Sequence, residues 1–294
     1  MHITLLGTGA MACLFGARLA AVAEVTLVGT WAEGLAAVQA RGIELEEAGA
    51  AHTVRVNAAP LGRSLEPADL ALVLVKTWQT EKVAPYLPAL LKPEGVALTL
   101  QNGLGNLERL GPRACLGVTT LGATLTGPGR VRAGGKGPTD IAGPGWIAEA
   151  FGRAGFETHL ADPAQIDALV WSKLVVNCGI NALTAILRVP TGELLARPDA
   201  ARLMECAAIE CAAVAKAKGL ALPFADPAAR VREVAQRTAA NHSSMFQDIV
   251  RGAPTEIEAI NGAVAREGQR LGVSTPVNEV LWGLIKALIT NKAE

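Results

Sequence analysis

The fold of the first half of this chain is decided by the stretch His2-Ile3-Thr4-Leu5-Leu6-Gly7-Thr8-Gly9-Ala10-Met11-Ala12. It opens with an apolar run that predicts a strand, and a helical pattern begins at about Met11. Between them, G-x-G-x-x-A permits a tight turn at Gly7, close approach of the backbone to a pyrophosphate at Gly9, and close helix–strand packing at Ala12. The amino end of the helix adds attraction for phosphate. The turn therefore predicts a nucleotide site, with a plain flexible turn as the alternative, and comprises Gly7, Thr8, Gly9, Ala10, Met11 and Ala12.

Beyond this turn, apolar runs of strand length alternate with helical patterns up to about residue 160. Residues 25–28 predict a second strand. Residues 70–75 and 96–100 are mostly apolar runs of strand length, as expected for strands buried on both faces of a parallel sheet. Residues 33–41 predict a helix and residues 52–57 an edge strand. Such alternation is typical of a doubly wound α/β sheet. Later strands or a hairpin are expected at residues 115–126, 131–133 and 140–142.

From about residue 162 the pattern changes to a succession of helices, expected at residues 163–187, 198–218, 226–239, 242–250, 256–271 and 277–289. We therefore predict two domains: an N-terminal Rossmann-type doubly wound sheet, residues 1–162, followed by an all-α C-terminal domain, residues 163–294. Thr255 and Glu258 have the spacing of a capping box, which would place Glu256 in a first helical turn. A carboxylate there is most often at the surface, stabilising the helix dipole.

Composition and charge argue against several classes of protein. Half of the residues are hydrophobic and 18% are charged, which is typical of a packed globular chain. The 27 basic residues balance the 27 acidic ones, which argues against a nucleic-acid partner. The five cysteines form no C-x-x-C pair, so we expect reduced thiols and no metal site. Arg18 interrupts the apolar residues 5–23 and no uninterrupted apolar run could span a bilayer, so we expect a cytoplasmic protein without a membrane partner.

Polar residues follow directly on the predicted strands. Lys76 comes after residues 70–75, and Asn102 comes after residues 96–100. Ligands of open α/β sheets lie at the carboxyl ends of strands, so both residues predict cofactor contact, with a solvated lysine and an ordinary turn as the alternatives. After the second strand, NAD enzymes carry a carboxylate and NADP enzymes an arginine, whereas this chain has Thr30. The residues alone leave the choice between the two cofactors open.

The predicted helix 166–187 is apolar nearly all round, yet Lys173, Asn177 and Asn181 recur in it at four-residue spacing along one stripe. Burial without partners would cost on the order of 1–3 kcal/mol for each amide and more for the charge. We expect this stripe to line a cleft, with a structural network as the alternative. A second polar face, expected on helix 242–250, contains Asn241, Ser244 and Asp248.

Taken together, these residues resemble the ketopantoate reductases (2-dehydropantoate 2-reductases), NADPH enzymes of pantothenate and coenzyme A synthesis. The motifs that carry the resemblance lie over both predicted domains, in the order Gly7-Thr8-Gly9-Ala10-Met11, Lys76-Thr77-Trp78-Gln79, Gln101-Asn102-Gly103, Trp171-Ser172-Lys173-Leu174 through Asn177 to Asn181-Ala182-Leu183-Thr184-Ala185, Asn241-His242-Ser243-Ser244-Met245 through Asp248, and Thr255-Glu256-Ile257 through Asn261-Gly262.

The resemblance implies reduction of ketopantoate to (R)-pantoate by hydride from NADPH. Lys173 would be the general acid that protonates the ketone oxygen, and Glu256 would position that lysine and contact substrate or cofactor. Hydride transfer builds alkoxide charge, which a cation with a transferable proton relieves. The implied substrate contacts are Asn102, Asn177, Asn181, Asn241 and Ser244. The implied cofactor contacts are the turn of residues 7–12 together with Thr30, Lys76, Asn102 and Glu256.

Two positions depart from the family pattern. Ala12 replaces the third glycine, and Thr30 stands where the family has a basic residue, so NAD stays open beside NADP. A reductase of another small 2-oxo acid and a non-catalytic nucleotide-sensing regulator are the alternative functions. The presence of both Lys173 and Glu256 argues against the regulator, because a sensor needs no proton donor. The expected partner is a small 2-oxo acid, and the oligomeric state is left open, a homodimer included.

Overall fold

The structure is a computed structural model that describes residues 1–290, so the last four residues of the predicted C-terminal domain, 291–294, lie outside the described residues. The chain divides into two compact units. The first comprises Met1–Gln101 and Asn106–Ile166, and the second comprises Asn102–Gly105 and the residues from Asp167 onward. This division falls a few residues after the expected boundary at 162 and assigns the short segment 102–105 to the helical unit.

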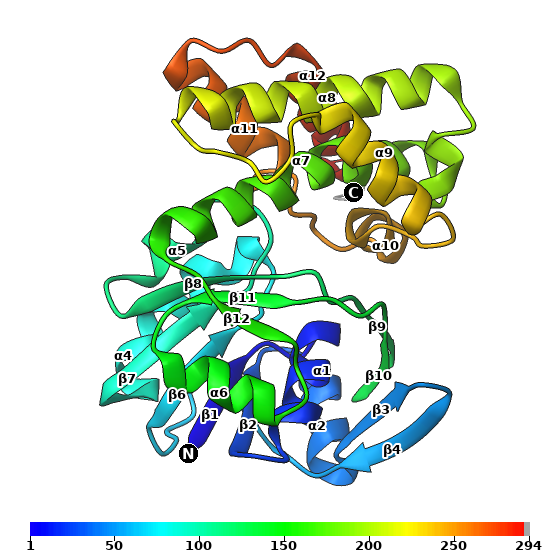
Figure 1. The fold of residues 1–294 in the computed structure, drawn as a ribbon. Helices are drawn as coiled ribbons and strands as arrows, with labels where there is room; N and C mark the ends of the chain where they lie inside the picture. The colour runs from blue at the N-terminus through cyan, green and yellow to red at the C-terminus, as the bar shows by residue number, and fades with distance from the viewer. Residues whose placement is uncertain (291–294) are drawn as a thin grey trace. The chain divides into compact units, whose positions relative to one another are not determined.

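The first unit is built on an eight-stranded sheet in the order β12-β11-β8-β7-β6-β1-β2-β5 (Figure 1). Its strands are β1 (His2–Leu6), β2 (Glu24–Gly29), β5 (Asn57–Pro60), β6 (Ala68–Val73), β7 (Leu91–Thr99), β8 (Ala114–Thr119), β11 (Thr139–Ala142) and β12 (Thr158–Leu160). All neighbours are parallel except β8 and β11. Counted along the chain, β5-β2-β1-β6-β7-β8 is the order 3-2-1-4-5-6 of a Rossmann sheet, which reverses between β1 and β6. The predicted fold class is confirmed.

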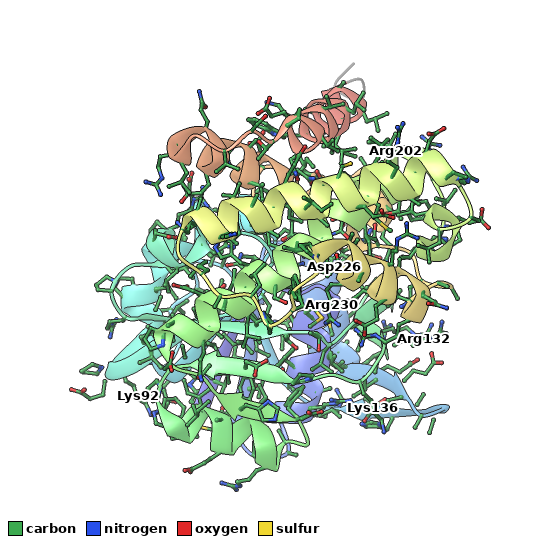
Figure 2. All side chains as sticks on the ribbon, turned by 45° about the horizontal axis from the view of Figure 1, so that its top comes forward. Lys92, Arg132, Lys136, Arg202, Asp226 and Arg230 are labelled. Carbon is green, nitrogen blue, oxygen red and sulfur yellow. The ribbon has the colours of Figure 1, made fainter. Side chains whose placement is uncertain are left out.

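A second sheet in this unit was not predicted. It has the order β4-β3-β10-β9, from β3 (Ile43–Glu47), β4 (Ala50–Val54), β9 (Ala123–Gly127) and β10 (Arg130–Ala133). Three of its strands contact α1 (Ala10–Leu19), beside which Figure 1 shows the sheet. The ion pairs Glu44–Arg130 and Glu46–Arg132 join β3 to β10, and Figure 2 labels Arg132. The predicted edge strand 52–57 was right in part: residues 52–54 belong to β4 at the edge of this small sheet, whereas Asn57 begins β5 at the edge of the large one.

The remaining helical segments of the first unit are mostly short. They are α2 (Ala32–Arg41), η1 (Thr77–Gln79), α3 (Thr80–Val83), η2 (Ala84–Tyr86), α4 (Leu87–Leu90), α5 (Asn106–Leu110) and α6 (Gly145–Arg153). Phe15 of α1 is fully buried and stacks on Phe156, with 4.5 Å between ring centroids, and contacts Phe151 of α6. The three rings belong to the buried apolar cluster of the first unit.

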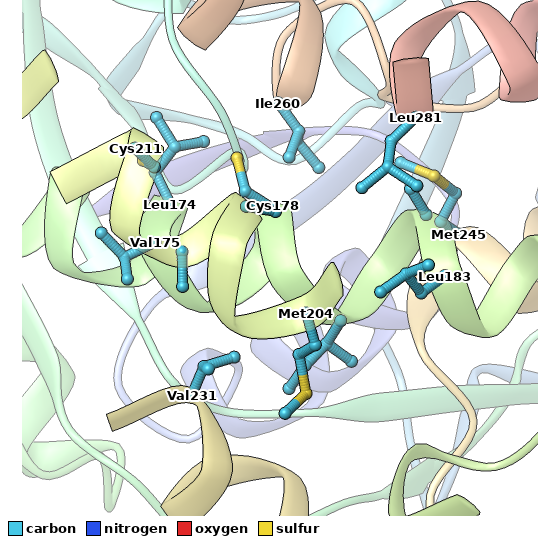
Figure 3. Packing of buried hydrophobic residues seen from close by; sticks show 14 of the residues in the cluster. Leu174, Val175, Cys178, Leu183, Met204, Cys211, Val231, Met245, Ile260 and Leu281 are labelled. Carbon is cyan, nitrogen blue, oxygen red and sulfur yellow. The ribbon is translucent and has the colours of Figure 1, made fainter. Parts of the chain in front are cut away.

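The second unit is helical, as predicted. It contains most of α7 (Pro163–Leu187), followed by η3 (Thr191–Leu194), α8 (Pro198–Ala217), α9 (Pro227–Arg237), α10 (Ser244–Arg251), α11 (Asn261–Leu271) and α12 (Pro276–Thr290). Figure 3 shows α7 residues such as Cys178 and Leu183 packed with Met204 of α8 and Leu281 of α12. Within residues 1–290, α7 is the helix that is long and apolar enough to cross a membrane, but 61% of its most apolar window is buried inside the protein, as in the core helix of a globular fold.

Two predicted helix starts were wrong. The helix expected from residue 256 begins at Asn261, and Glu256 lies in the preceding turn. The expected capping box does not form, because the Glu258 carboxylate accepts hydrogen bonds from Arg266 and Trp282 instead. The helix expected from residue 242 begins at Ser244. The Ser243 hydroxyl accepts a hydrogen bond from the N–H of Phe246 and so fixes that start.

A buried amide joins three helices of the second unit. Asn278 of α12 is fully buried, and its oxygen accepts a hydrogen bond from Asn261 of α11 at 3.0 Å. Its nitrogen donates to the carbonyl of Ala207 and to the carboxylate of Glu210, both on α8, at 3.0 and 2.8 Å. The same carboxylate accepts the N–H groups of Val277 and Asn278, at the amino end of α12. This network sets the position of α12 on α8 and α11.

We expect Asn278→Ala to lower the free energy of unfolding by about 3 kcal/mol, because each buried polar group left unpaired costs about 1–3 kcal/mol. Urea unfolding followed by circular dichroism measures the change. The control is Asn57→Ala, which removes an exposed amide bonded to Glu24 and should change stability by less than about 0.5 kcal/mol. Equal losses in the two variants would contradict the role given to Asn278.

Candidate functional site

The predicted nucleotide turn lies where β1 ends, beside the reversal of strand order. Gly7 has a φ of +137°, and a Cβ there would lie 3.1 Å from the backbone of Leu74, so only glycine fits without strain. Apart from the adjoining residues of the chain, no atom lies within 4 Å of the Cβ position of Gly9, which leaves the backbone open to a ligand. Ala12 is fully buried against the sheet. Each residue thus has the environment that the fingerprint requires.

The amino end of α1 fits a phosphate group. Gly9 is its N-cap and contributes no side-chain hydrogen bond, and the first turn carries no acidic residue. The N–H groups of this turn therefore keep their capacity to donate, and the helix dipole favours an anion there. These residues fit the pyrophosphate of a dinucleotide.

The end of β2 offers fewer fixed groups. A Cβ at Gly29 would lie 2.8 Å from the Thr8 side chain, so glycine here makes room for the nucleotide turn. Thr30 is exposed. The ring of Trp31 lies directly against Gly34 of α2, where no side chain could be added without a clash. Glu33 follows in the first turn of α2 and is exposed.

The ends of β6 and β7 are joined by a residue to which the sequence assigned no role. The Gln101 amide nitrogen donates to the carbonyl of Val75 at 2.8 Å and to the Thr80 hydroxyl at 2.9 Å. Its oxygen accepts a hydrogen bond from the Thr99 hydroxyl at 2.9 Å. Lys76, half-buried, directly follows Val75 and precedes η1. The signal for Gln101 was its place in the Gln101-Asn102-Gly103 motif, which does not distinguish a ligand contact from a structural bond.

In the second unit, Asn102 lies beside Glu256. The Asn102 amide nitrogen donates to Oε2 of Glu256 at 3.2 Å, across 154 residues of sequence. The backbone holds this arrangement, because the N–H of Leu104 donates to the carbonyl of Ala259 at 2.9 Å. Gly103 has a φ of +76° and packs so closely on Ala259 that a side chain would clash. The segment 102–105 is thus attached to the turn that carries Glu256.

Glu256 and Lys173 form the charged part of the site. Glu256 is only 4% exposed, so the surface position expected for such a carboxylate was wrong. Burial lowers the pKa of Lys173 from 10.5 to about 8, and the negative charge of Glu256 opposes that shift. The structure therefore brings together Lys173, Glu256 and Asn102, which the sequence had assigned to one site.

The stripe on α7 continues with two amides. Asn177 is half-buried and Asn181 is 7% exposed. Neither side chain makes a hydrogen bond to another of the described residues, 1–290, so both amides keep their capacity for a ligand. One turn after Asn181, the Thr184 hydroxyl lies 2.7 Å from that of Ser243. This contact brings the start of α10, with half-buried Ser244, to the end of the stripe.

Asn241 departs from the expectation, because it is exposed and precedes α10 instead of lying on it. Its carbonyl accepts hydrogen bonds from the N–H and hydroxyl of Thr191. Asp248 is buried and pairs with Arg251. Within residues 1–290, no cluster of three or more His, Cys, Asp or Glu side chains could hold a metal ion.

The chain matches two family models: ketopantoate reductase PanE/ApbA over residues 3–145, and ketopantoate reductase PanE/ApbA C terminal over residues 165–289. It is 36% identical to the 2-dehydropantoate 2-reductase of Halobacterium salinarum, over 97% of this chain and 98% of that protein. A PanE/ApbA family ketopantoate reductase from Ralstonia eutropha JMP134 has a TM-score of 0.93 at 32% identity, covering 100% of both chains. D-mandelate dehydrogenase with NADH and anilino(oxo)acetate has a TM-score of 0.92 at 28% identity, covering 99% of each chain.

The lowered pKa of Lys173 predicts how stability depends on pH. Between about pH 8 and pH 10.5 the unfolded chain binds this proton while the folded protein has released it, so raising the pH through this window favours folding. Relative to Lys173→Met, the wild type should gain on the order of 3 kcal/mol of unfolding free energy across the window. Urea unfolding of both proteins at several pH values measures the difference. A difference that does not change with pH would contradict the burial of the ammonium.

Proposed function

Because the chain belongs to the ketopantoate reductase family, we propose that it reduces 2-dehydropantoate to (R)-pantoate with NADPH, for pantothenate and coenzyme A biosynthesis. The observation that carries the proposal is the Lys173 ammonium on a buried helix, beside Glu256 and in line with two amides that have capacity for a ligand. The enzyme would act in the cytoplasm on a small 2-oxo acid, without a membrane or nucleic-acid partner, either alone or as a homodimer.

Lys173 is the general acid of the proposed reaction. The chemistry that NADPH would supply when bound is hydride transfer to the carbonyl carbon, which would build negative charge on the carbonyl oxygen. The Lys173 Nζ donates a proton to that oxygen. A pKa of about 8 keeps the ammonium mostly protonated at neutral pH and makes it a better acid than an ordinary lysine. Glu256 holds the ammonium and offsets the penalty of its burial.

The substrate is oriented by the polar stripe. Asn177 and Asn181 offer amide groups to the hydroxyl and carboxylate of ketopantoate, and Ser244 adds a hydroxyl at the far end of the stripe. Asn102 contacts the substrate and the cofactor from its position beside Glu256. Asn241 is exposed, so its substrate contact is supported by the family resemblance alone.

The cofactor is bound by residues 7–12, with Lys76, Thr30 and Glu256 as further contacts. The open Gly9 and the uncapped start of α1 support the binding of the pyrophosphate. Trp31, fixed against Gly34, offers a flat face for adenine. These features support a nicotinamide dinucleotide and do not distinguish its two forms.

An NADH-dependent reductase of another 2-oxo acid is the second candidate. It is favoured by the likeness to D-mandelate dehydrogenase, whose structure contains NADH. Thr30 supplies no cation, and Glu33 is an exposed carboxylate nearby that could accept a hydrogen bond from a ribose hydroxyl. The two candidates differ in cofactor and substrate, not in the chemistry of Lys173.

The two candidates are separated by oxidation of NADPH and NADH by the purified protein, with ketopantoate, phenylglyoxylate and pyruvate as substrates. We expect the highest kcat/KM with ketopantoate and NADPH. The preference for NADPH should be smaller than a bidentate arginine–phosphate contact directly after β2 would give. A higher kcat/KM with NADH, or with either other acid, would favour the second candidate.

Replacement of the lysine tests the mechanism. Lys173→Ala should lower kcat by roughly 10²–10⁴-fold, the usual effect of losing a positioned acid, while NADPH affinity barely changes. In the wild type, kcat should also fall above about pH 8 as this ammonium loses its proton.

Asn177→Ala is the matched control on the same stripe, and it should raise KM much more than it lowers kcat. Circular dichroism and NADPH binding on each sample exclude loss of folding. If Lys173→Ala raised KM and kept a near-normal kcat, the lysine would bind the substrate carboxylate and would not be the acid.

A further inference from the structure

The turn after the edge strand β5 lies beside the end of β2. The two strands are parallel, and Gly29 is the register partner of Pro60. The N–H of Leu61 donates to the carbonyl of Gly29 at 2.8 Å, so the pairing extends past the end of both strands. The N–H of Arg63 then donates to the carbonyl of Pro60 at 3.2 Å, which closes a tight turn. Arg63 therefore lies on the turn of residues 60–63, which is hydrogen-bonded to the carboxyl end of β2.

In a Rossmann sheet the ribose next to adenine binds at the end of the second strand, where NADP enzymes place a basic residue. Thr30 provides no charge at that position. We propose that the guanidinium of Arg63, on the turn of the neighbouring strand β5, is the cation that binds the ribose 2′-phosphate. This inference rests on the proposed use of NADPH and names the residue that selects it.

The charge distribution supports this assignment. Arg63 is the single Lys or Arg in residues 29–40 and 57–75, the segments around the ends of β2 and β5. It is exposed, and its guanidinium makes no ion pair or hydrogen bond with the other described residues. Arg55 is also exposed, but it lies at the opposite, amino end of β5 and donates a hydrogen bond to the carbonyl of Ala40.

Arginine suits this role chemically. Its guanidinium offers several N–H donors in a plane and stays charged at every relevant pH, which matches a phosphate with its acceptor oxygens. The neighbouring hydroxyls of Ser64 and Thr30, both exposed, add further donors. The opposing group is Glu33, whose carboxylate would repel a phosphate and favour the unphosphorylated ribose of NAD.

Binding of adenosine 2′,5′-bisphosphate and of 5′-AMP, measured by calorimetry, tests the proposal without catalysis. Arg63→Ala should lower the affinity for the bisphosphate by about 10- to 100-fold. It should change the affinity for 5′-AMP by less than about twofold, because only the bisphosphate carries the 2′-phosphate. Arg63→Lys should recover part of the lost affinity. Raising the salt concentration should lower the affinity for the bisphosphate more in the wild type than in Arg63→Ala, because salt screens the attraction between the guanidinium and the phosphate.

Arg41→Ala is the matched control. Arg41 is also exposed, and it ends α2, roughly 14 Å along the helix axis from Ala32. We expect both affinities to stay at wild-type values in this variant. Equal affinities for the bisphosphate in Arg63→Ala and Arg41→Ala would overturn the proposal, as would a wild type that binds 5′-AMP as tightly as the bisphosphate.

The result is separable from the proposed reaction. If the wild type failed to reduce ketopantoate but bound the bisphosphate through Arg63, the substrate assignment would fall and the cofactor residue would stand. If it reduced ketopantoate with NADPH and Arg63→Ala left both the cofactor preference and the bisphosphate affinity unchanged, the assignment of Arg63 would fall and the reaction would stand.

Discussion

One interaction in the second unit constrains the residues around it: the charge of Lys173, which is half-buried on α7, lies near the charge of Glu256. Removing the Lys173 charge from water costs several kcal/mol, and the negative charge of Glu256 offsets part of that cost. Glu256 is buried in turn and accepts a hydrogen bond from Asn102, whose loop is attached by Leu104 to the turn carrying Glu256. Two opposite charges buried near each other contribute less net stability than well-packed apolar residues would. The position of Lys173 on an apolar helix therefore fits the proposed role in catalysis better than a role in folding.

The first unit separates apolar and polar groups in a different way. The strands β1 and β6 and the second half of β7 are mostly apolar and buried, and polar side chains follow where these strands end. Some of these groups are structural, as Gln101 shows by joining the ends of β6 and β7. Others stay at least partly exposed, as Lys76 and Thr30 do. The carboxyl edge of a parallel sheet thus supplies both the framework and the ligand contacts of a nucleotide site.

Local patterns predicted much of this fold. Helix α7 has the bounds 163–187 expected from its apolar pattern, and the glycine turn stands between β1 and α1 as expected. The small sheet was missed because β3 pairs with β10, some 85 residues later in the chain, and no local pattern encodes that pairing. The start of α11 was misplaced because Ile257 and Ile260 are buried at helical spacing although the chain forms a turn there. The burial of Glu256 was missed for a similar reason, because Glu256 contacts Asn102, which lies 154 residues earlier in the chain.

The two ends of the proposed nucleotide site are constrained to different degrees. At the pyrophosphate end, Gly7 and Gly29 have no room for a side chain, so packing within the sheet fixes the residues there. At the ribose end, Thr30, Glu33 and Arg63 are exposed and lie on turns or a first helical turn, where substitution disturbs little packing. One fold can therefore keep its dinucleotide site while substitutions at the ribose end change whether it recognises the 2′-phosphate of NADP. The structural likeness to a D-mandelate dehydrogenase solved with NADH fits this division, because a shared fold is compatible with different side chains at the ribose end.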